Sequence, residues 1–393
     1  MSNISNHIYL DHAAATPLDL AVLEAMLPYL KDDFANPSSL YMAARTTRGA
    51  VEEARASIAN ILGAKPTEIV FTSGGTEGNN LAVQGVLRAH PGAGWVTTSI
   101  EHDAVLAPVK PMEAAGHPAV VVPVKADGIV RVPDVVAAIS DETVLVSVML
   151  ANNEIGTIQP VGDVAKAIAV IRADRARRDI DLPLYLHTDA VQAANYLDLH
   201  VTRLGIDLLT INGSKIYGPK GTGALYVRHG TKLEPLHYGG GQERGRRSGT
   251  ENVAGVVGLA RALELAAEKR AGESHRLAEL RDHLATGLLQ ALPDAIINGD
   301  PRRRLPNNLN LTIPGAEGEA LVLYLDNAGI MASTGSACST GSLEPSHVLL
   351  AIGRTPAEAN SSLRLTLGRS TTPDQIAVVL HLLPPVVQRL RQI

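Results

Sequence analysis

The most constraining feature of this 393-residue sequence is an alternation of helical and strand patterns between about residues 40 and 230. In the segment 50–63, AVEEARASIANILG, apolar residues such as Val51 and Ile58 recur at helical spacing, and Gly63 can cap the helix end. The runs EIVFTS, AVVVPV and TVLVSVML are short and aliphatic, which is typical of buried strands. The alternation therefore predicts an α/β layer built on a largely parallel sheet.

The pattern changes after Gly249. Residues 249–292 form a nearly continuous helical pattern, which we interpret as a connector to a smaller C-terminal domain. Beyond it, NNLNLTIP and LRLTLG predict strands, and Thr372 before Pro373 predicts the start of a last helix. A chain of this length is expected to form roughly two to three domains.

Composition excludes several classes of function. A net charge of −5 and an aromatic content of 3% give no reason to expect nucleic acid as the main ligand. No apolar run approaches the ~20 residues that a membrane span requires, and the first residues do not read as a secretory signal. Because Cys338 is the single cysteine, neither an intramolecular disulfide nor a cysteine-rich metal site can form. We expect a cytoplasmic protein with no bound metal and no membrane or nucleic-acid partner.

The segment LLTINGSKIYGPKGTGALYV holds Lys215 in a loop of glycines and small polar residues between two apolar runs. Upstream, the aliphatic run in LPLYLHTDAVQ ends in Asp189. A lysine and an aspartate delivered from adjacent strand ends suggest a pyridoxal 5′-phosphate (PLP) site. The lysine would form a Schiff base, and the aspartate would keep the pyridine nitrogen protonated. Taken alone, Lys215 could also be a surface lysine in a hairpin, and Asp189 could be a helix-capping aspartate.

The strand pattern EIVFTS runs directly into GGTEGNN and then into a helical pattern. A strand, a turn of small residues and a helix start form an anion site, because free backbone N–H groups and the helix dipole point at one spot. Gly74 and Gly75 would let the backbone approach the anion closely, and Thr76 can add a hydroxyl. The alternative is an ordinary capped turn, since the segment matches neither a Walker loop nor GxGxxG.

Further polar residues lie at the ends of strand patterns or within them. His102 follows a strand in VTTSIEHDAV and could lie on a cofactor ring or transfer protons, although a lone histidine is more often structural. The paired amides Asn152 and Asn153 in MLANNEIGTIQP follow a strand pattern, where one of their partners could be a cofactor's phenolic oxygen, or the pair could simply shape a loop. Arg364 in LRLTLGR suits a bidentate grip on a substrate carboxylate, with a salt-bridged strand arginine as the alternative.

Cys338 lies in ASTGSACSTGSLEPSH, a segment dominated by Gly, Ser, Thr and Ala. Most lone cysteines are small buried hydrophobes. This segment has no apolar periodicity around the cysteine, and its composition predicts an exposed loop. We therefore interpret Cys338 as a nucleophilic thiol.

Taken together, these motifs resemble those of the cysteine desulfurases, and in particular the branch that supplies sulfur for iron–sulfur clusters. The resemblance runs from Tyr9 to about Arg369. It rests on the ordered segments YLDHAAATP, FANPSS, FTSGGTEGNN, EH, ANNEIGTIQP, HTDAVQ, GSKIYGPKG, ERGRRSGTEN, GSACSTGSLEPS and LRLTLGR. A set of motifs in fixed order is far more specific than any one of them.

The resemblance implies a fold-type-I PLP-dependent transferase that acts as a homodimer. Residues 15–255 would form a large PLP-binding domain, in which helices sandwich a mainly parallel sheet. Residues 1–14 and 256–393 would form a smaller α+β domain with the connecting helix. The catalytic cysteine loop would lie at about residues 333–345.

The resemblance also assigns residues to the cofactor. Lys215 would be the Schiff-base lysine, Asp189 would pair with the pyridine nitrogen, and His102 would stack on the ring. The remaining contacts would come from Gly75 and Thr76 at the phosphate, from Gln192 and Asn153 near the phenolic oxygen, and from Thr250 at the phosphate of the partner subunit's cofactor.

One segment departs from the family pattern. The family has Ser-Gly-His before the lysine, whereas this chain has Asn212, Gly213 and Ser214. The family's serine and histidine help to bind the phosphate. Asn212 and Ser214 can still donate hydrogen bonds, but the imidazole is absent.

The implied reaction converts L-cysteine to L-alanine and leaves the sulfur on Cys338 as a persulfide. Arg364, together with Asn36, would hold the substrate carboxylate, and Lys215 or His102 would transfer protons. A sulfur-acceptor protein such as an iron–sulfur scaffold would receive the sulfur.

Other functions share this fold, because one fold hosts many chemistries. A selenocysteine lyase and a class V aminotransferase are the nearest alternatives, and a scaffold that has lost turnover is a third. The sequence does not separate cluster assembly from tRNA thiolation or other cofactor pathways as the destination of the sulfur.

Overall fold

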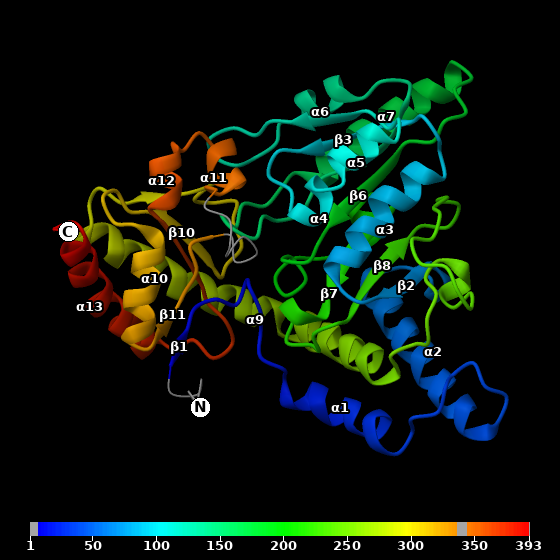
Figure 1. Ribbon diagram of the computed structural model, residues 1–393, viewed down its shortest axis with the longest axis horizontal. Coiled ribbons are helices and arrows are strands. Elements are labelled where there is room, and N and C mark those ends of the chain that lie inside the picture. Colours follow the sequence, from blue (N-terminus) through cyan, green and yellow to red (C-terminus); the bar gives the residue numbers. More distant parts are fainter. Residues whose placement is uncertain (1–6, 336–343, 393) are drawn as a thin grey trace.

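The computed structural model describes residues 7–335 and 344–392 and confirms the α/β class (Figure 1). In the described residues the largest sheet has seven strands, and six of them point the same way, with only β8 antiparallel to its neighbours. In spatial order the strands are β2 (Ile69–Thr72), β8 (Gly223–Val227), β7 (Leu208–Asn212), β6 (Tyr185–Asp189), β5 (Thr143–Ser147), β3 (Gly94–Thr98) and β4 (Ala119–Val122).

Helices cover both faces of this sheet. Because successive strand residues point to opposite faces, Phe71 joins a core with α2, α7 and α9, whereas Val70 joins a second core with α3 and the α4–α5 segment. The bounds of these helices are α2 Met42–Leu62, α3 Gly75–Arg88, α4 Asp103–Leu106, α5 Val109–Ala114, α7 Val161–Arg177 and α9 Val253–Ala291. The predicted helix-covered, mainly parallel sheet is therefore confirmed.

The helix predicted over 50–63 and the strand predicted in AVVVPV are both present, but the start of the helix and the burial of the strand were predicted wrongly. The helix expected over 50–63 begins at Met42, because its first two turns bury Ala44 and Thr47, although Gly63 caps it as expected in the left-handed conformation. The run AVVVPV was expected to be a buried strand, but Val120 is 46% exposed. The reason is that β4 lies at the edge of the sheet, where β3 is its only neighbouring strand among the described residues.

Segments near both chain ends meet in a second α+β unit, seen on the left of Figure 1. Leu10 packs there with Leu284 of α9 and with Leu365 in a separate apolar core. Its strands are β1 (Ile8–Tyr9) paired with β11 (Ile330–Met331), and β10 (Asn308–Thr312) between β12 (Ser362–Thr366) and β9 (Ile296–Ile297). Its helices are α10 (Gly318–Asn327) and α13 (Pro373–Leu390). The two strands and the last helix expected in this region are confirmed.

The long helix α9 links the two units, since it packs against α2 and the N-terminal helix α1 at one end and against α13 at the other. Domain boundaries at residues 15 and 255 stay a prediction. No helix in the two described ranges combines the length and apolarity that a membrane span needs. The remaining elements are short apart from α1 (Leu20–Lys31): α6 (Val132–Ala138), α8 (Val201–Leu204), α11 (His347–Ala351), α12 (Pro356–Asn360), η2 (Pro66–Glu68), η3 (Gly213–Lys215) and η4 (Glu243–Gly245).

Candidate active site

A pocket of about 380 Å³ lies at the carboxyl ends of the co-directional strands of the large sheet. Ligands of open α/β sheets bind at this edge, because the loops that leave the strands converge there. Of the residues predicted from the sequence, those that line the pocket are Gly75, Thr76, His102, Asn153, Asp189, Gln192, Asn212, Lys215 and Arg364.

Asp189 and Lys215 reach this pocket from neighbouring strands. Asp189 ends β6 and pairs in register with Thr210 of β7, while Lys215 follows β7 in η3. The Asp189 side chain is buried, and its Oδ1 accepts a hydrogen bond of 2.9 Å from the Val191 N–H. The adjacency of the two strand ends, expected from the sequence, is confirmed.

Sequence reasoning missed Asn79, which also lines the pocket. It lies one turn into α3, and its Nδ2 donates a 2.6 Å hydrogen bond to Asp189 Oδ2. Asn79 is 1% exposed, and its Oδ1 has no hydrogen-bond partner within the described chain. The Asp189 carboxylate is thus fixed by two donors. The only sequence signal was the spacing that places Asn79 on the same helix face as Gly75.

Lys215 is held against the N-terminal segment. Its Nζ donates to the Ala14 carbonyl, and its own carbonyl accepts a 2.7 Å hydrogen bond from Asn195 Nδ2. Tyr217, two residues on, adopts a φ of 63° and accepts a 2.8 Å hydrogen bond at its hydroxyl from the Arg369 N–H. The lysine loop is therefore hydrogen-bonded both to the N-terminal segment and to the segment that follows β12.

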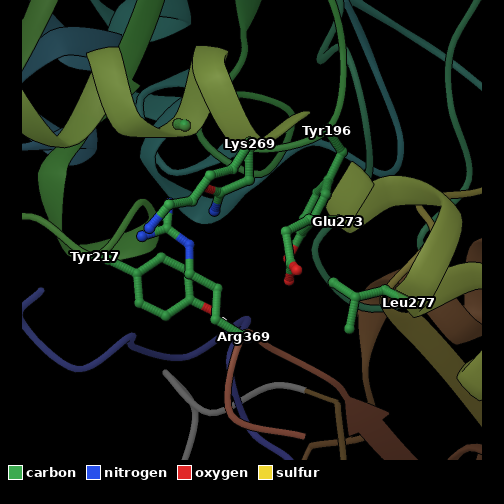
Figure 2. Close-up of a pocket in the computed structure, with 8 residues that line it drawn as sticks. Tyr196, Tyr217, Lys269, Glu273, Leu277 and Arg369 are labelled. Carbon is green, nitrogen blue, oxygen red and sulfur yellow. Dashed lines mark hydrogen bonds between the residues drawn. The ribbon is translucent and has the colours of Figure 1, made fainter. Parts of the chain in front are cut away.

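Figure 2 shows the small cavity behind this loop, where the Arg369 side chain lies along the Tyr217 ring. The guanidinium carbon is 4.0 Å from the ring centroid, which is a cation–π contact. Arg369 also forms a 2.8 Å ion pair with Asp19. These contacts connect the segment after β12 to the lysine loop and to the start of α1.

The turn between β2 and the start of α3 has the geometry expected of an anion cradle. A Cβ on Gly75 would lie 2.8 Å from Val191 Cγ2, so only glycine fits without movement there. Gly74 has a φ of 151°, which favours glycine as well. The first N–H groups of a helix lack intrahelical acceptors and carry the positive end of the dipole. This end of α3 therefore suits a phosphate.

His102 caps the short helix α4, and its Nδ1 accepts a 3.0 Å hydrogen bond from the Ala104 N–H. A neutral His102 therefore carries its proton on Nε2. The neighbouring Glu101 was not singled out from the sequence, although the EH pair pointed to it. Glu101 is fully buried, and burial raises the pKa of its carboxyl to about 8. Its carbonyl accepts a 2.9 Å hydrogen bond from Nε2 of His347, a further pocket residue that sequence reasoning missed.

Arg364 enters the pocket from β12 and is only 2% exposed. Its Nη1 donates to the carbonyls of Asn153 and Gly335 at 3.1 and 2.7 Å. Its Nη2 forms a 2.8 Å ion pair with Asp11. Both interpretations of this arginine thus describe part of what is seen, since it is salt-bridged in a strand and also faces the pocket.

Three predicted residues do not line the pocket. Ser214 points to Asn212 instead, and Asn36 and Thr250 are exposed side chains. Cys338 lies outside the described residues, so its predicted role stays a prediction. Thr250 was expected to act on the cofactor of a partner subunit, which its exposure permits.

The pocket fits PLP by its donor set. A buried carboxylate, an amine on the adjacent strand end and a glycine cradle at a helix N-terminus occur in one cavity of about 380 Å³. Ligand pockets for small molecules have volumes of about 300–1,000 Å³. Asp189 would face the ring nitrogen, Lys215 the aldehyde, and the start of α3 the phosphate.

Comparison with known proteins assigns the chain to a family. Residues 8–379 match the family model described as aminotransferase class-V. The "Cysteine desulfurase IscS" of Dictyoglomus turgidum is 45% identical over 392 residues, which cover 99% of this chain and 97% of that protein.

Two solved structures are similar as well. A NifS-like protein superposes with a TM-score of 0.88 at 33% identity, covering 98% of this chain and 100% of the other. A structure of SspA in complex with cysteine has a TM-score of 0.77 at 36% identity, covering 92% of this chain and 98% of that one.

The fold is that of the fold-type-I transferases, a class whose members depend on PLP. The chain belongs to the class-V aminotransferase family, and within it to the cysteine desulfurases.

Proposed function

We propose that this chain binds PLP and converts L-cysteine to L-alanine, with transfer of the sulfur to Cys338 as a persulfide. The observation that carries the proposal is the placement of Lys215 and the buried Asp189 on adjacent strand ends beside the α3 cradle. The 45% identity to a named cysteine desulfurase over nearly the full chain supports the reaction type.

Each side chain has a task in this proposal. When bound, PLP supplies a conjugated ring that withdraws electron density from the substrate's α-carbon. Asp189, held by Asn79 and Val191, presents a fixed anion to the ring nitrogen. Lys215 Nζ would hold the aldehyde, and the same amine could accept the substrate's α-proton. His102 offers its Nε2 in the same pocket as a stacking surface and a second proton carrier.

Arg364 is proposed to bind the substrate carboxylate, which would compete with Asp11 for the guanidinium. The Arg364 Nε is buried and donates to no described residue, so hydrogen-bonding capacity remains. Asn36 is exposed and lies outside this pocket. A contribution of Asn36 to substrate binding therefore requires a second subunit to bring it close.

We propose a homodimer that uses the face of α1 and the segment that follows it. Large apolar side chains are exposed there, including Leu27 at 49%, Phe34 at 79% and Leu40 at 89%. Such clusters on a folded protein mark contact surfaces. Leu27→Glu with Leu40→Glu should give monomers by analytical ultracentrifugation. Val170→Glu, at a side chain 67% exposed on α7, is the matched control and should stay dimeric.

The test of the reaction is direct. The purified chain, incubated with PLP and L-cysteine, should release alanine and, with a reducing agent, sulfide in equal amounts. Selenocysteine and keto acids assayed in parallel separate the lyase and aminotransferase alternatives. Equal alanine release by wild type and Cys338→Ala under single-turnover conditions would count against the transfer step. We further propose a cytoplasmic location and an acceptor such as an iron–sulfur scaffold, which cell fractionation and trapping of the mixed disulfide would test.

A further inference from the structure

Asn212 and Ser214 form a local pair at the end of β7. Asn212 Oδ1 accepts two hydrogen bonds of 3.1 Å, one from the Ser214 N–H and one from the Ser214 hydroxyl. Asn212 lines the pocket, whereas Ser214 does not. The two residues therefore have different relations to a ligand, although both were predicted as phosphate contacts.

The pair fixes the orientation of the Asn212 amide. A backbone N–H can only donate, so the atom that faces the Ser214 N–H must be the amide oxygen rather than the nitrogen. Since the oxygen faces Ser214, Nδ2 points away from it. Nδ2 donates to no residue within the described ranges and lies beside the glycine cradle. A Cβ on Gly75 would be 3.5 Å from Nδ2, and one on Gly74 would be 3.8 Å from both Nδ2 and Oδ1.

A contact from Ser214 to an anion would break its hydrogen bond to Asn212. A serine hydroxyl carries a single donor hydrogen, and that hydrogen is directed to Asn212 Oδ1. Asn212 Nδ2, by contrast, has two donor hydrogens that no described residue accepts, and it lies near the start of α3, where the dipole favours a negative charge.

We propose that Ser214 is a positioning residue that aims the Asn212 amide at the cofactor phosphate and does not contact the phosphate itself. The inference rests on the proposed binding of PLP at this pocket. It reassigns the two residues that replace the family's serine and histidine in this chain.

The test is a double-mutant cycle on binding rather than on turnover. Dissociation constants of the apoprotein for PLP and for pyridoxal, which lacks the phosphate, are measured by equilibrium dialysis. Asn212→Ala should weaken PLP binding about 10- to 100-fold, the range for a hydrogen bond to a charged group, and leave pyridoxal binding unchanged. Ser214→Ala should weaken PLP binding less, and Ser214→Thr, which keeps the hydroxyl, should restore it.

The decisive comparison is Ser214→Ala in the Asn212→Ala background, where it should have no further effect. Full additivity of the two substitutions, or an equal loss of pyridoxal affinity in Ser214→Ala, would overturn the inference. Should Asn212→Ala fold poorly, Asn212→Asp keeps the oxygen that faces Ser214 and should weaken PLP binding alone by charge repulsion. A wild-type chain that takes up no PLP would refute the proposed function, whereas wild-type binding with an additive cycle refutes only the role of Ser214.

Discussion

The buried Glu101 carboxyl should make the free energy of unfolding depend on pH, and the size of this dependence can be worked out from the structure. This carboxyl is fully buried, with Oε1 accepting from the Met149 N–H at 2.8 Å and the Thr98 hydroxyl at 2.7 Å. Oε2 has no partner among the described residues. Burial raises the pKa from 4.5 to about 8, so the folded protein holds this proton at neutral pH.

The sign follows from proton linkage. The unfolded chain releases the proton near its ordinary pKa of 4.5, whereas the folded chain retains it until about pH 8. Folding is therefore most favoured by this group below pH 4.5, and the contribution falls by about 1.4 kcal/mol per pH unit until the folded pKa is reached. At pH 7 the loss is about 3 kcal/mol.

Glu101→Gln removes the titration, and the glutamine amide oxygen can accept from Met149 and Thr98 in place of the carboxyl Oε1. The variant should match wild type at pH 4.5 and be more stable by about 3 kcal/mol at pH 7, because its free energy of unfolding no longer declines with pH. Urea denaturation of the apoprotein across pH 4.5–8 measures this difference. Glu113→Gln, at an exposed position in α5, should follow wild type throughout. A Glu101→Gln variant that loses stability equally at every pH would show that the buried carboxyl is ionised and paired.

Further outcomes follow from the same contacts. Lys215→Ala should lose the visible absorbance of bound cofactor after dialysis, while Lys232→Ala, at an exposed lysine, should keep it. Cys338→Ala should bind the cofactor like wild type yet release essentially no sulfide, and wild-type release would remove the thiol from the reaction. Asp11→Ala should lower the free energy of unfolding by about 3 kcal/mol, because it leaves the guanidinium of the buried Arg364 unpaired. A change below about 0.5 kcal/mol, the usual range for surface positions, would show that water replaces Asp11 there.

The local sequence predicted the elements that carry the chemistry. Apolar runs of strand length placed Asp189 and Lys215 at the ends of β6 and β7, and turn glycines placed Gly75 at the start of α3. These signals succeed because strand length, capping and turn chemistry depend on neighbours in the chain. The extent of α2 and the exposure of β4 were missed, because burial depends on which elements pack against a segment.

The sequence by itself determined the α/β order of the chain, the strand-end positions of the lysine and the aspartate, and the family. Tertiary structure alone decided which groups bind the site side chains. Asn79 donates a hydrogen bond to Asp189, 110 residues away in the chain, and Asp11 pairs with Arg364, 353 residues away. No periodicity encodes such pairs, because hydrogen bonds and ion pairs depend on distances that exist only after the elements that carry the two residues have packed. The position of the Asn212 amide near the start of α3 has the same origin, because β7 and α3 become neighbours only in the folded chain.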